Sequence, residues 1–128
     1  MRIENIKFKA KRLDNGEWID GSLTHFKNVA YIRHEERGYH GKFYLITYKV
    51  NPDTVCQFTG LKDRNGVEVF ENDIVKVVDW EEKICNVEYK DYGFCLYGKC
   101  FRDNVMPLFV AVDNCYIYVI GNKFDKEK

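Results

Sequence analysis

The soft side chains that could hold a metal ion are three histidines and five cysteines in a chain of 128 residues. The set worth assembling into a site is His25, His34, His40, Cys95 and Cys100. Zinc ligands usually occur in closely spaced pairs such as Cys-x-x-Cys or His-x-x-x-His, and neither spacing is present. The sequence therefore predicts loop histidines, small core cysteines, and neither a metal nor another cofactor.

Nucleophilic and acid–base chemistry is no better represented. A cysteine nucleophile needs a neighbouring base and an orienting group, and neither Cys56 nor Cys95 lies in a local signature of that kind. The carboxylate pairs Glu35-Glu36 and Glu81-Glu82 are adjacent in sequence, so in an extended chain their side chains point apart. The sequence predicts that the protein is not an enzyme. An active site would need a cleft that gathers Cys or His with carboxylates from distant segments.

Aromatic side chains interleaved with basic ones are the remaining pattern with a chemical meaning, because such residues stack on the bases of single-stranded nucleic acid. Two groups of this kind are present: Tyr39, His40, Lys42, Phe43 and Tyr44, and then Tyr89, Lys90, Tyr92 and Lys99. Twenty Lys and Arg balance twenty Asp and Glu, so the electrostatic footprint of a nucleic-acid-binding protein is absent. Nucleic-acid binding is an alternative that the charge does not favour. The tentative binding surface is the polar loop expected over residues 33–41 and its flank, represented by His34, Arg37, Tyr39, His40, Lys42 and Tyr44.

The densest structural signal lies in residues 57–78. Asn65-Gly66 stands between two apolar-containing runs and predicts a two-residue hairpin turn with positive φ at both positions. The Glu71-Asn72-Asp73 segment then predicts a corner, with Asn72 left-handed and Asp73 bonded to nearby backbone. Residues 74–78 are apolar except for Lys76, which indicates a central strand. Gly60, Gly66 and Gly121 form no phosphate-binding pattern and are interpreted as turn glycines.

This run resembles the signature of the YopX family of phage and prophage proteins, in residues 58–66 and 71–75. Residues 6–10 and 119–122 resemble the opening and closing strands of that family. The resemblance implies an all-β fold containing a small barrel, a phage or prophage origin, and no defined activity, because the family is poorly characterised. One departure is Asn72, where the family usually has Gly.

The remaining segments predict strands with little helix. Residues 6–11 alternate apolar residues with lysines, as in a half-buried strand whose lysines face water; residues 18–19, 23–32, 43–50, 83–90, 94–97 and 115–120 are further strands. Breaks are expected at 14–16, 20–21 and 51–53, and helix at most over 102–106. We therefore expect an all-β protein. A small Src-homology-3-like barrel in the C-terminal half would pack with an additional β subdomain from the N-terminal half.

The length predicts a single domain over 1–128, divided into subdomains 1–56 and 57–128. No signal peptide or membrane span is recognised, so we expect reduced thiols, a cytoplasmic location in a bacterial host and no membrane partner. The functional hypothesis is a non-enzymatic phage or prophage accessory protein that acts by binding or self-assembly, with homo-oligomers hiding sheet edges. The alternatives are a nucleic-acid-binding module and an inhibitor or modulator of a host protein.

Overall fold

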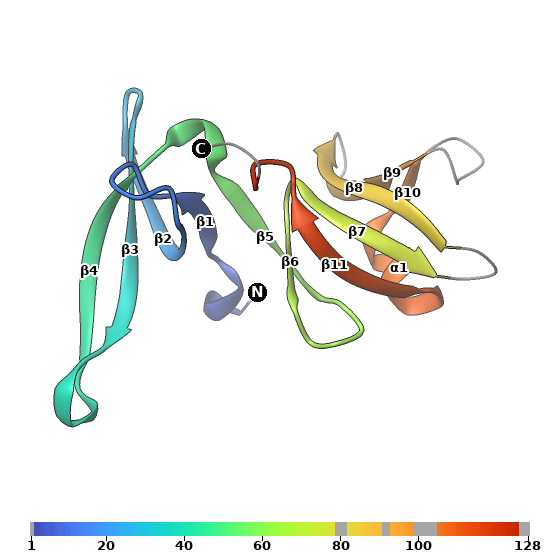
Figure 1. Ribbon diagram of the computed structural model, residues 1–128. Coiled ribbons are helices and arrows are strands. Elements are labelled where there is room, and N and C mark those ends of the chain that lie inside the picture. Colours follow the sequence, from blue (N-terminus) through green and yellow to red (C-terminus); the bar gives the residue numbers. More distant parts are fainter. Residues whose placement is uncertain (1, 79–81, 91–92, 99–104, 126–128) are drawn as a thin grey trace. The chain divides into compact units, whose positions relative to one another are not determined.

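The computed structural model describes residues 2–78, 82–90, 93–98 and 105–125 (Figure 1). The chain divides into two compact units, residues 1–57 and residues 58–128. Both are built mainly from antiparallel strands, which confirms the predicted all-β class. Strand β5 (Cys56–Lys62) belongs to both units, because its first two residues pair with β1 and later ones pair with β6.

The N-terminal unit is an antiparallel sheet in the order β4-β3-β2-β1-β5. Its strands are β1 (Phe8–Lys11), β2 (Trp18–Phe26), β3 (Val29–Arg37) and β4 (Phe43–Val50), and its short 3₁₀ turns are η1 (Ile3–Asn5), η2 (Tyr39–Gly41) and η3 (Pro52–Thr54). One face of the sheet holds the core, which consists of Ala10, Ile19, Ala30, Ile32 and Val50.

The sheet of this unit curls until the end of β1 meets the end of β4. Arg12 forms a β-bridge with Val50. On either side of that bridge, the Leu13 N–H donates to the Lys49 carbonyl at 3.1 Å, and the Asn51 N–H donates to the Lys11 carbonyl at 2.8 Å. The outer edge of β4 is therefore occupied at its C-terminal end.

Two expectations about loops and breaks in this unit are wrong. The polar stretch 33–41 is not all loop, because β3 continues to Arg37 and pairs there with Phe43 of β4. Charged residues are tolerated in this stretch since Arg33, Glu35 and Arg37 remain exposed while their backbone pairs. Gly21 does not break the chain but lies inside β2. A Cβ at Gly21 would lie 2.1 Å from the Arg33 carbonyl oxygen, so the glycine permits β2 and β3 to approach.

The lysines of β1 also differ from expectation. β1 lies between β2 and β5, so it is not a solvated edge. Lys11 is buried, and the Nζ atoms of Lys9 and Lys11 lie 4.7 and 5.6 Å from the centroid of the Trp18 ring. The stems of these side chains cover an aromatic ring, as amphipathic lysines commonly do.

The C-terminal unit contains a five-stranded antiparallel sheet in the order β10-β9-β8-β7-β11. Its elements are β6 (Glu68–Phe70), β7 (Asp73–Val78), β8 (Glu82–Lys90), β9 (Gly93–Tyr97), β10 (Val105–Pro107), helix α1 (Leu108–Asn114) and β11 (Tyr116–Asn122). β7 lies between β8 and β11 and buries Val75 and Val77, as predicted for a central strand. The hairpin of β8 and β9 is also confirmed. Closure into a barrel of the Src-homology-3-like kind stays a prediction.

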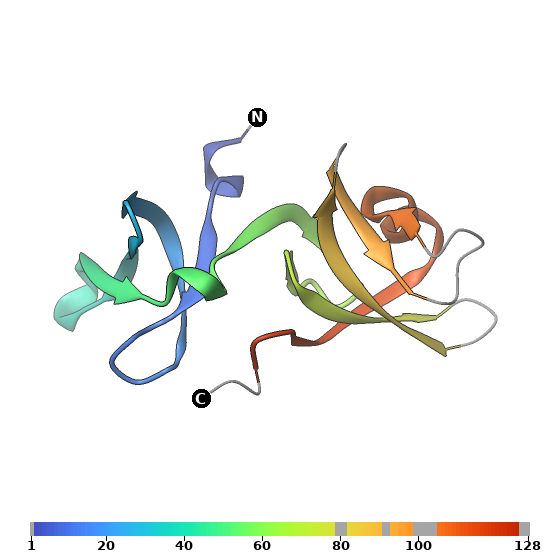
Figure 2. The same ribbon diagram turned by 90° about the horizontal axis from the view of Figure 1, so that it is seen from above.

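Helix α1 forms where the sequence predicted no helix. Helix was expected at most over 102–106, of which residues 102–104 lie outside the described part of the chain and residues 105–106 belong to β10. Pro107 precedes the helix with φ of −57°, a value that its ring favours. Leu108 and Ala111, three positions apart, are buried on one face. Figure 2 shows α1 beside β9 and β10. Tertiary packing thus determines a helix that its β-branched residues do not favour.

The hairpin at Asn65-Gly66 exists, but its turn is longer than predicted. Gly66 has φ of 81°, whereas Asn65 is not among the residues with positive φ. The Gly66 N–H donates to the Asp63 carbonyl at 3.1 Å, and the Asp63 N–H donates to the Val67 carbonyl at 2.8 Å. This pattern is a type I turn followed by one left-handed residue. It forms because Asp63 Oδ1 accepts the Asn65 and Val67 N–H groups at 2.8 and 2.9 Å.

The signature corner joins the closing strand. Asn72 has φ of 69°, the left-handed conformation expected for it. Asp73 is buried, with Oδ2 accepting the Phe70 N–H at 2.8 Å and Oδ1 accepting Asn122 Nδ2 at 2.8 Å. Gly121 lies in a bulge within β11 and is not a turn glycine. Gly60, with φ of 83°, occupies the irregular part of the β5–β6 pairing. These residues serve backbone geometry.

Candidate interaction surface

The β3–β4 hairpin extends beyond the rest of its sheet. Pairing between β2 and β3 ends at Ser22 and Arg33, whereas β3 and β4 remain paired out to Arg37 and Phe43 (Figure 1). We call residues 34–46 the arm. All six residues of the tentative binding surface, His34, Arg37, Tyr39, His40, Lys42 and Tyr44, fall within it.

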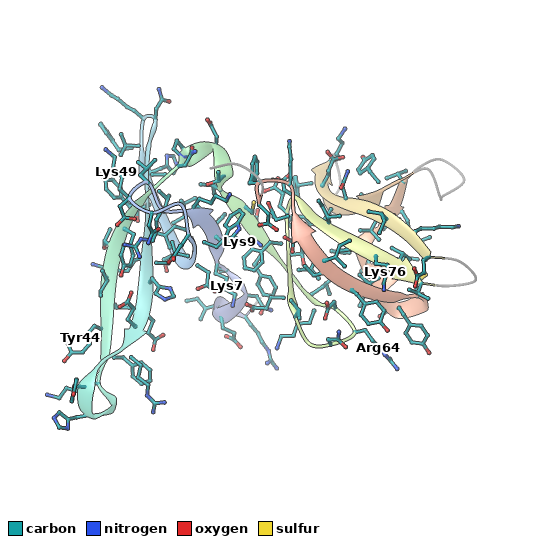
Figure 3. All side chains as sticks on the ribbon, viewed as in Figure 1. Lys7, Lys9, Tyr44, Lys49, Arg64 and Lys76 are labelled. Carbon is teal, nitrogen blue, oxygen red and sulfur yellow. The ribbon has the colours of Figure 1, made fainter. Side chains whose placement is uncertain are left out.

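The arm exposes apolar side chains on both of its faces. Phe43 and Leu45 point to one face and Tyr44 and Ile46 to the other, since successive side chains of a strand alternate. Their exposed fractions are 62%, 64%, 50% and 37%, and Tyr39 at the tip is 88% exposed. Figure 3 shows Tyr44 projecting from β4 near the tip and Lys49 at the other end of the strand. A strand with four consecutive exposed apolar residues at a sheet edge is unusual in a monomeric protein.

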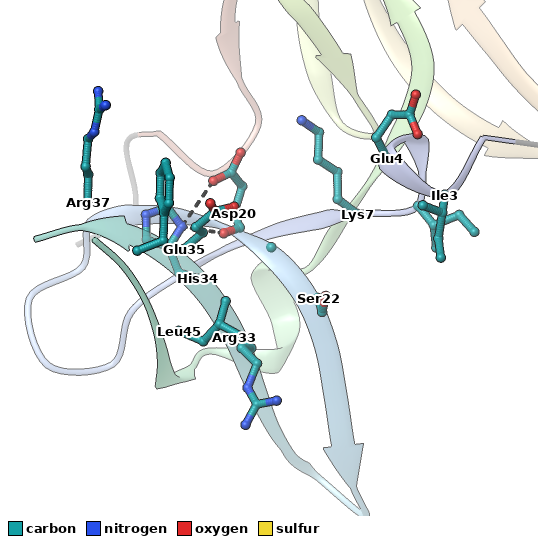
Figure 4. A pocket seen from close by; sticks show the side chains of 13 residues that line it. Ile3, Glu4, Lys7, Asp20, Ser22, Arg33, His34, Glu35, Arg37 and Leu45 are labelled. Carbon is teal, nitrogen blue, oxygen red and sulfur yellow. Dashed lines mark hydrogen bonds and ion pairs between the residues drawn. The ribbon is translucent and has the colours of Figure 1, made fainter. Parts of the chain in front are cut away.

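One face of the arm continues into a groove of about 790 Å³ (Figure 4). Its walls come from β2, β3, β4 and the segment around η1, and the lining residues that bear on its chemistry are Lys7, Asp20, Ser22, Arg33, His34 and Glu35. Ile3, Ile6, Phe43 and Leu45 add apolar surface. The groove thus mixes cations, carboxylates and exposed apolar side chains.

The groove gathers a histidine with carboxylates, which is the arrangement that an enzyme would need. His34 Nδ1 lies 2.6 Å from the Asp20 carbonyl oxygen and 3.3 Å from Asp20 Oδ1. A carbonyl can only accept, so Nδ1 carries the proton. A hydroxyl is also near, but in Figure 4 Ser22 lies apart from His34, and no hydrogen bond joins them in the described structure. Among the described residues, His34 thus has an orienting group and no hydrogen bond to a nucleophilic side chain.

A polar network lies where the arm joins the unit. The Tyr48 hydroxyl donates to Glu36 Oε1, and this bond raises the pKa of Tyr48 because it stabilises the neutral phenol. The Arg12 guanidinium lies 4.1 Å from the centroid of the Tyr48 ring. Arg12 in turn donates to both oxygens of Asp14, at 2.9 and 2.6 Å, and these bonds lower the pKa of the Asp14 carboxyl. Glu36 is thus bonded, whereas Glu35 lines the groove.

The other residues considered for chemistry are dispersed. Cys56 is buried and its Sγ donates to the Thr54 carbonyl at 3.3 Å. His25 borders a small cavity of about 220 Å³ with Pro52 and Val55. Among the described residues, no three His, Cys, Asp or Glu side chains come together as a metal site would require.

The second group of aromatic and basic residues in the sequence is also dispersed. Tyr89 packs edge-on against Phe94, with ring centroids 5.0 Å apart, and Lys90 lies over Tyr97. Tyr92, Lys99 and also Cys100 lie outside the described residues. The described members therefore make cross-strand contacts, as aromatic residues on sheets often do.

One match identifies the family of this chain. A family model described as YopX protein matches residues 7–127. The chain belongs to the YopX family. The match spans both units, so the arm and the signature corner are parts of one YopX chain. Neither the curated proteins nor the solved structures contain a match. None of the helices in the described structure has the length and apolar composition needed to cross a membrane.

The sequence did not identify Leu45 and Ile46 of this YopX protein as surface residues. The sequence around these two residues alternates as in any half-buried strand. Whether the side chains of such a strand are exposed on both faces depends on what packs against them. The signal that was present is the neighbouring charge. Glu35, Glu36, Arg37 and Lys42 all lie shortly before the apolar run, and charged residues are rarely fully buried unless they are paired.

Proposed function

We propose that this YopX protein is a non-enzymatic binding protein whose interaction surface is the arm. The observation that carries the proposal is the exposure of Phe43, Tyr44, Leu45 and Ile46 on both faces of an edge strand. A two-stranded ribbon is marginally stable alone, so apolar residues on both of its faces favour a bound partner. We further propose, from the family resemblance, that the protein is a phage or prophage accessory protein acting in the cytoplasm of a bacterial host.

The groove supports binding better than catalysis. His34 is oriented by Asp20, but its neighbours Arg33 and Glu35 are exposed and no nucleophile is bonded to it in the described structure. The charges of the arm also cancel, because Glu35 and Glu36 balance Arg37 and Lys42. A neutral apolar surface with a polar border fits a protein partner, including a host protein that the binding would inhibit or modulate.

Affinity capture from lysogenic or infected bacteria tests the proposal, with the wild-type chain compared with Phe43→Asp. We expect the variant to lose the captured partner because a charge replaces an exposed apolar anchor. Ile84→Asp is the matched control: Ile84 is 57% exposed on β8 of the other unit, and this variant should retain the partner. Equal capture by both variants and the wild type would show that the arm is not the surface.

A second candidate function, nucleic-acid binding, is favoured by one face of the β3–β4 pair. The strand register places Tyr31 opposite Lys49 and Arg37 opposite Phe43, with Arg33 between these pairs on the same face. The Arg37 guanidinium lies 5.7 Å from the centroid of the Phe43 ring. Cations beside aromatic rings on an open sheet are the elements of a single-strand stacking platform.

A further inference from the structure

The outer edge of the arm is an unpaired strand edge with a defined length. Pairing of β4 with β3 is uninterrupted from Phe43 to Val50. On the opposite edge, the Lys49 carbonyl accepts the Leu13 N–H. Backbone groups of an antiparallel strand point alternately to its two edges, so Phe43, Leu45 and Thr47 share the outward orientation of Lys49. In the described structure these three residues have no strand on that side.

From this edge we infer that two copies of the chain pair antiparallel through β4, with the two-fold axis at Leu45. The inference rests on the proposed function and names its partner as a second copy. A two-fold axis perpendicular to the sheet keeps each face on the same side, so residue i must meet a residue on its own face. Only registers centred on a residue satisfy that condition.

The Leu45 register follows from what occupies the rest of the edge. A register centred on Tyr44 shifts the pairing into the η2 turn, where Gly41 has φ of 74°. A register centred on Ile46 places Phe43 against Lys49, whose carbonyl is already bonded to Leu13. Centred on Leu45, all three outward residues pair, Phe43 with Thr47 of the second copy and Leu45 with its own counterpart.

The side chains of the segment complement themselves in this register. Phe43 would meet Thr47 of the second copy on one face and Tyr44 would meet Ile46 on the other, each pair occurring twice. Aromatic residues opposite β-branched ones are favourable cross-strand pairs. Residues 43–48 carry no charge, so no like charges face each other along the paired length. A foreign strand would need this same pattern, which the second copy supplies.

The contact is small, because three backbone pairs lie at the low end of specific interfaces. We therefore expect a reversible dimer with a dissociation constant on the order of 10 µM. Sedimentation equilibrium of the full, reduced chain from about 5 to about 500 µM should show the mass rising from 15.2 kDa toward twice that value. A wild-type chain that remains monomeric across this range overturns the inference.

Two substitutions at the proposed two-fold axis should weaken the dimer without unfolding the monomer. Leu45→Pro removes an outward N–H that β3 does not use, and Leu45→Lys brings two like charges together at the axis. Each should weaken dimerisation about tenfold or more while the far-UV circular dichroism of the monomer is unchanged. If Leu45→Pro fails to fold, Leu45→Lys alone decides. Ile84→Lys, on β8, should dimerise as the wild type does, and equal dimerisation of Leu45→Lys and the wild type overturns the inference.

Cross-linking tests the register directly. Leu45→Cys should be joined to its counterpart by a short bis-maleimide, above the background that the native cysteines give in the wild type. Lys49→Cys should not, because Lys49 faces Gly41 of the second copy and its counterpart lies about 27 Å away along the strand. Cross-linking of both variants alike rejects the Leu45 axis. If no dimer forms yet Phe43→Asp still abolishes capture of a cellular protein, the arm remains the binding surface and the second copy is the wrong partner.

Discussion

Asp63 holds the signature hairpin against the closing strand. Its Oδ1 accepts the Asn65 and Val67 N–H groups, and its Oδ2 accepts the Val119 N–H at 2.9 Å from β11. The carboxylate is nearly buried, so these three donors would have no water to replace it. A buried carboxylate that accepts three hydrogen bonds from backbone N–H groups is a structural residue.

Replacing Asp63 by Ala should lower the free energy of unfolding by about 3 kcal/mol, because three backbone donors lose a charged acceptor. Urea denaturation followed by circular dichroism measures the change. Asp53 is exposed, and Asp53→Ala should change the same quantity by less than about 0.5 kcal/mol. Similar stability of both variants would mean that the Asp63 side chain is not needed for the hairpin.

A separate prediction concerns Asn72, whose backbone is left-handed with φ of 69°. Its N–H donates to the Val87 carbonyl and its carbonyl accepts the Lys123 N–H, so its backbone bonds do not depend on the side chain. Asn72→Val should cost about 2 kcal/mol in unfolding free energy, since a β-branched residue resists positive φ. Asn72→Gly should stay within about 0.5 kcal/mol of the wild type. The reverse order of the two variants would contradict this account.

The interaction of Asp14 with Arg12, at the base of the arm, should make the stability of the protein sensitive to acid. Hydrogen bonds from Arg12 lower the pKa of Asp14, so its contribution to stability is present above the unfolded carboxyl pKa, about 3.9. The contribution is lost as the pH falls through the lower, folded pKa. Asp14→Asn should therefore have a lower thermal midpoint than the wild type at pH near 7, and the difference should shrink below about pH 4. A difference between Asp14→Asn and the wild type that stays constant over this pH range would contradict this explanation.

At the scale of elements, helix α1 gives a matched pair of adjacent residues. Leu108 is buried in the core of the C-terminal unit, whereas Phe109 is exposed. Leu108→Ala should lower the unfolding free energy by about 3 kcal/mol because it leaves a cavity. Phe109→Ala should change it by less than about 0.5 kcal/mol. A larger effect at Phe109 than at Leu108, measured by urea denaturation, would mean that the helix packs through its other face.

The same helix shows how far the sequence predicts the elements. The local sequence pattern correctly predicted β4, the central strand β7 and the β8–β9 hairpin. In β7 the apolar pattern also agrees with the burial, whereas most of β4 is exposed. The local pattern failed at β3, whose polar half forms a strand only because β4 pairs with it, and at α1, whose β-branched residues favour a strand. Gly21 was misjudged because the close approach of two strands leaves no local signal.

The residues of the candidate surface were likewise predicted only in part. The polar and aromatic character of residues 34–44 was sufficient to predict His34, Arg37, Tyr39, His40, Lys42 and Tyr44 as a tentative binding surface, and they share the arm. Leu45 was not predicted, because its importance depends on the position of β4 at the sheet edge. Their role in binding stays a prediction until the arm variants are measured.

At the scale of the whole molecule, the two units carry opposite charge. Residues 1–57 contain ten Lys and Arg against seven Asp and Glu, and residues 58–128 contain ten against thirteen, which gives +3 and −3. The neutral total hides this asymmetry. A basic N-terminal unit that also carries Tyr31, Arg33, Arg37 and Phe43 on one face is what keeps nucleic-acid binding as the second candidate.

Salt dependence separates that candidate from protein binding. We expect labelled single-stranded and duplex oligonucleotides to show no binding at about 200 mM salt and little at about 50 mM, because three net positive charges release few counterions. Fluorescence anisotropy with the wild-type chain measures this. The opposite result would be tight binding at the lower salt concentration that weakens steeply at the higher one. If Arg33→Ala and Arg37→Ala abolish that binding while Lys76→Ala in the acidic unit does not, the partner of the arm is a nucleic acid and not a protein. Because Leu45→Lys adds a cation to the same face, it should then bind oligonucleotides more tightly even as it loses the dimer, so one variant distinguishes the two uses of the arm.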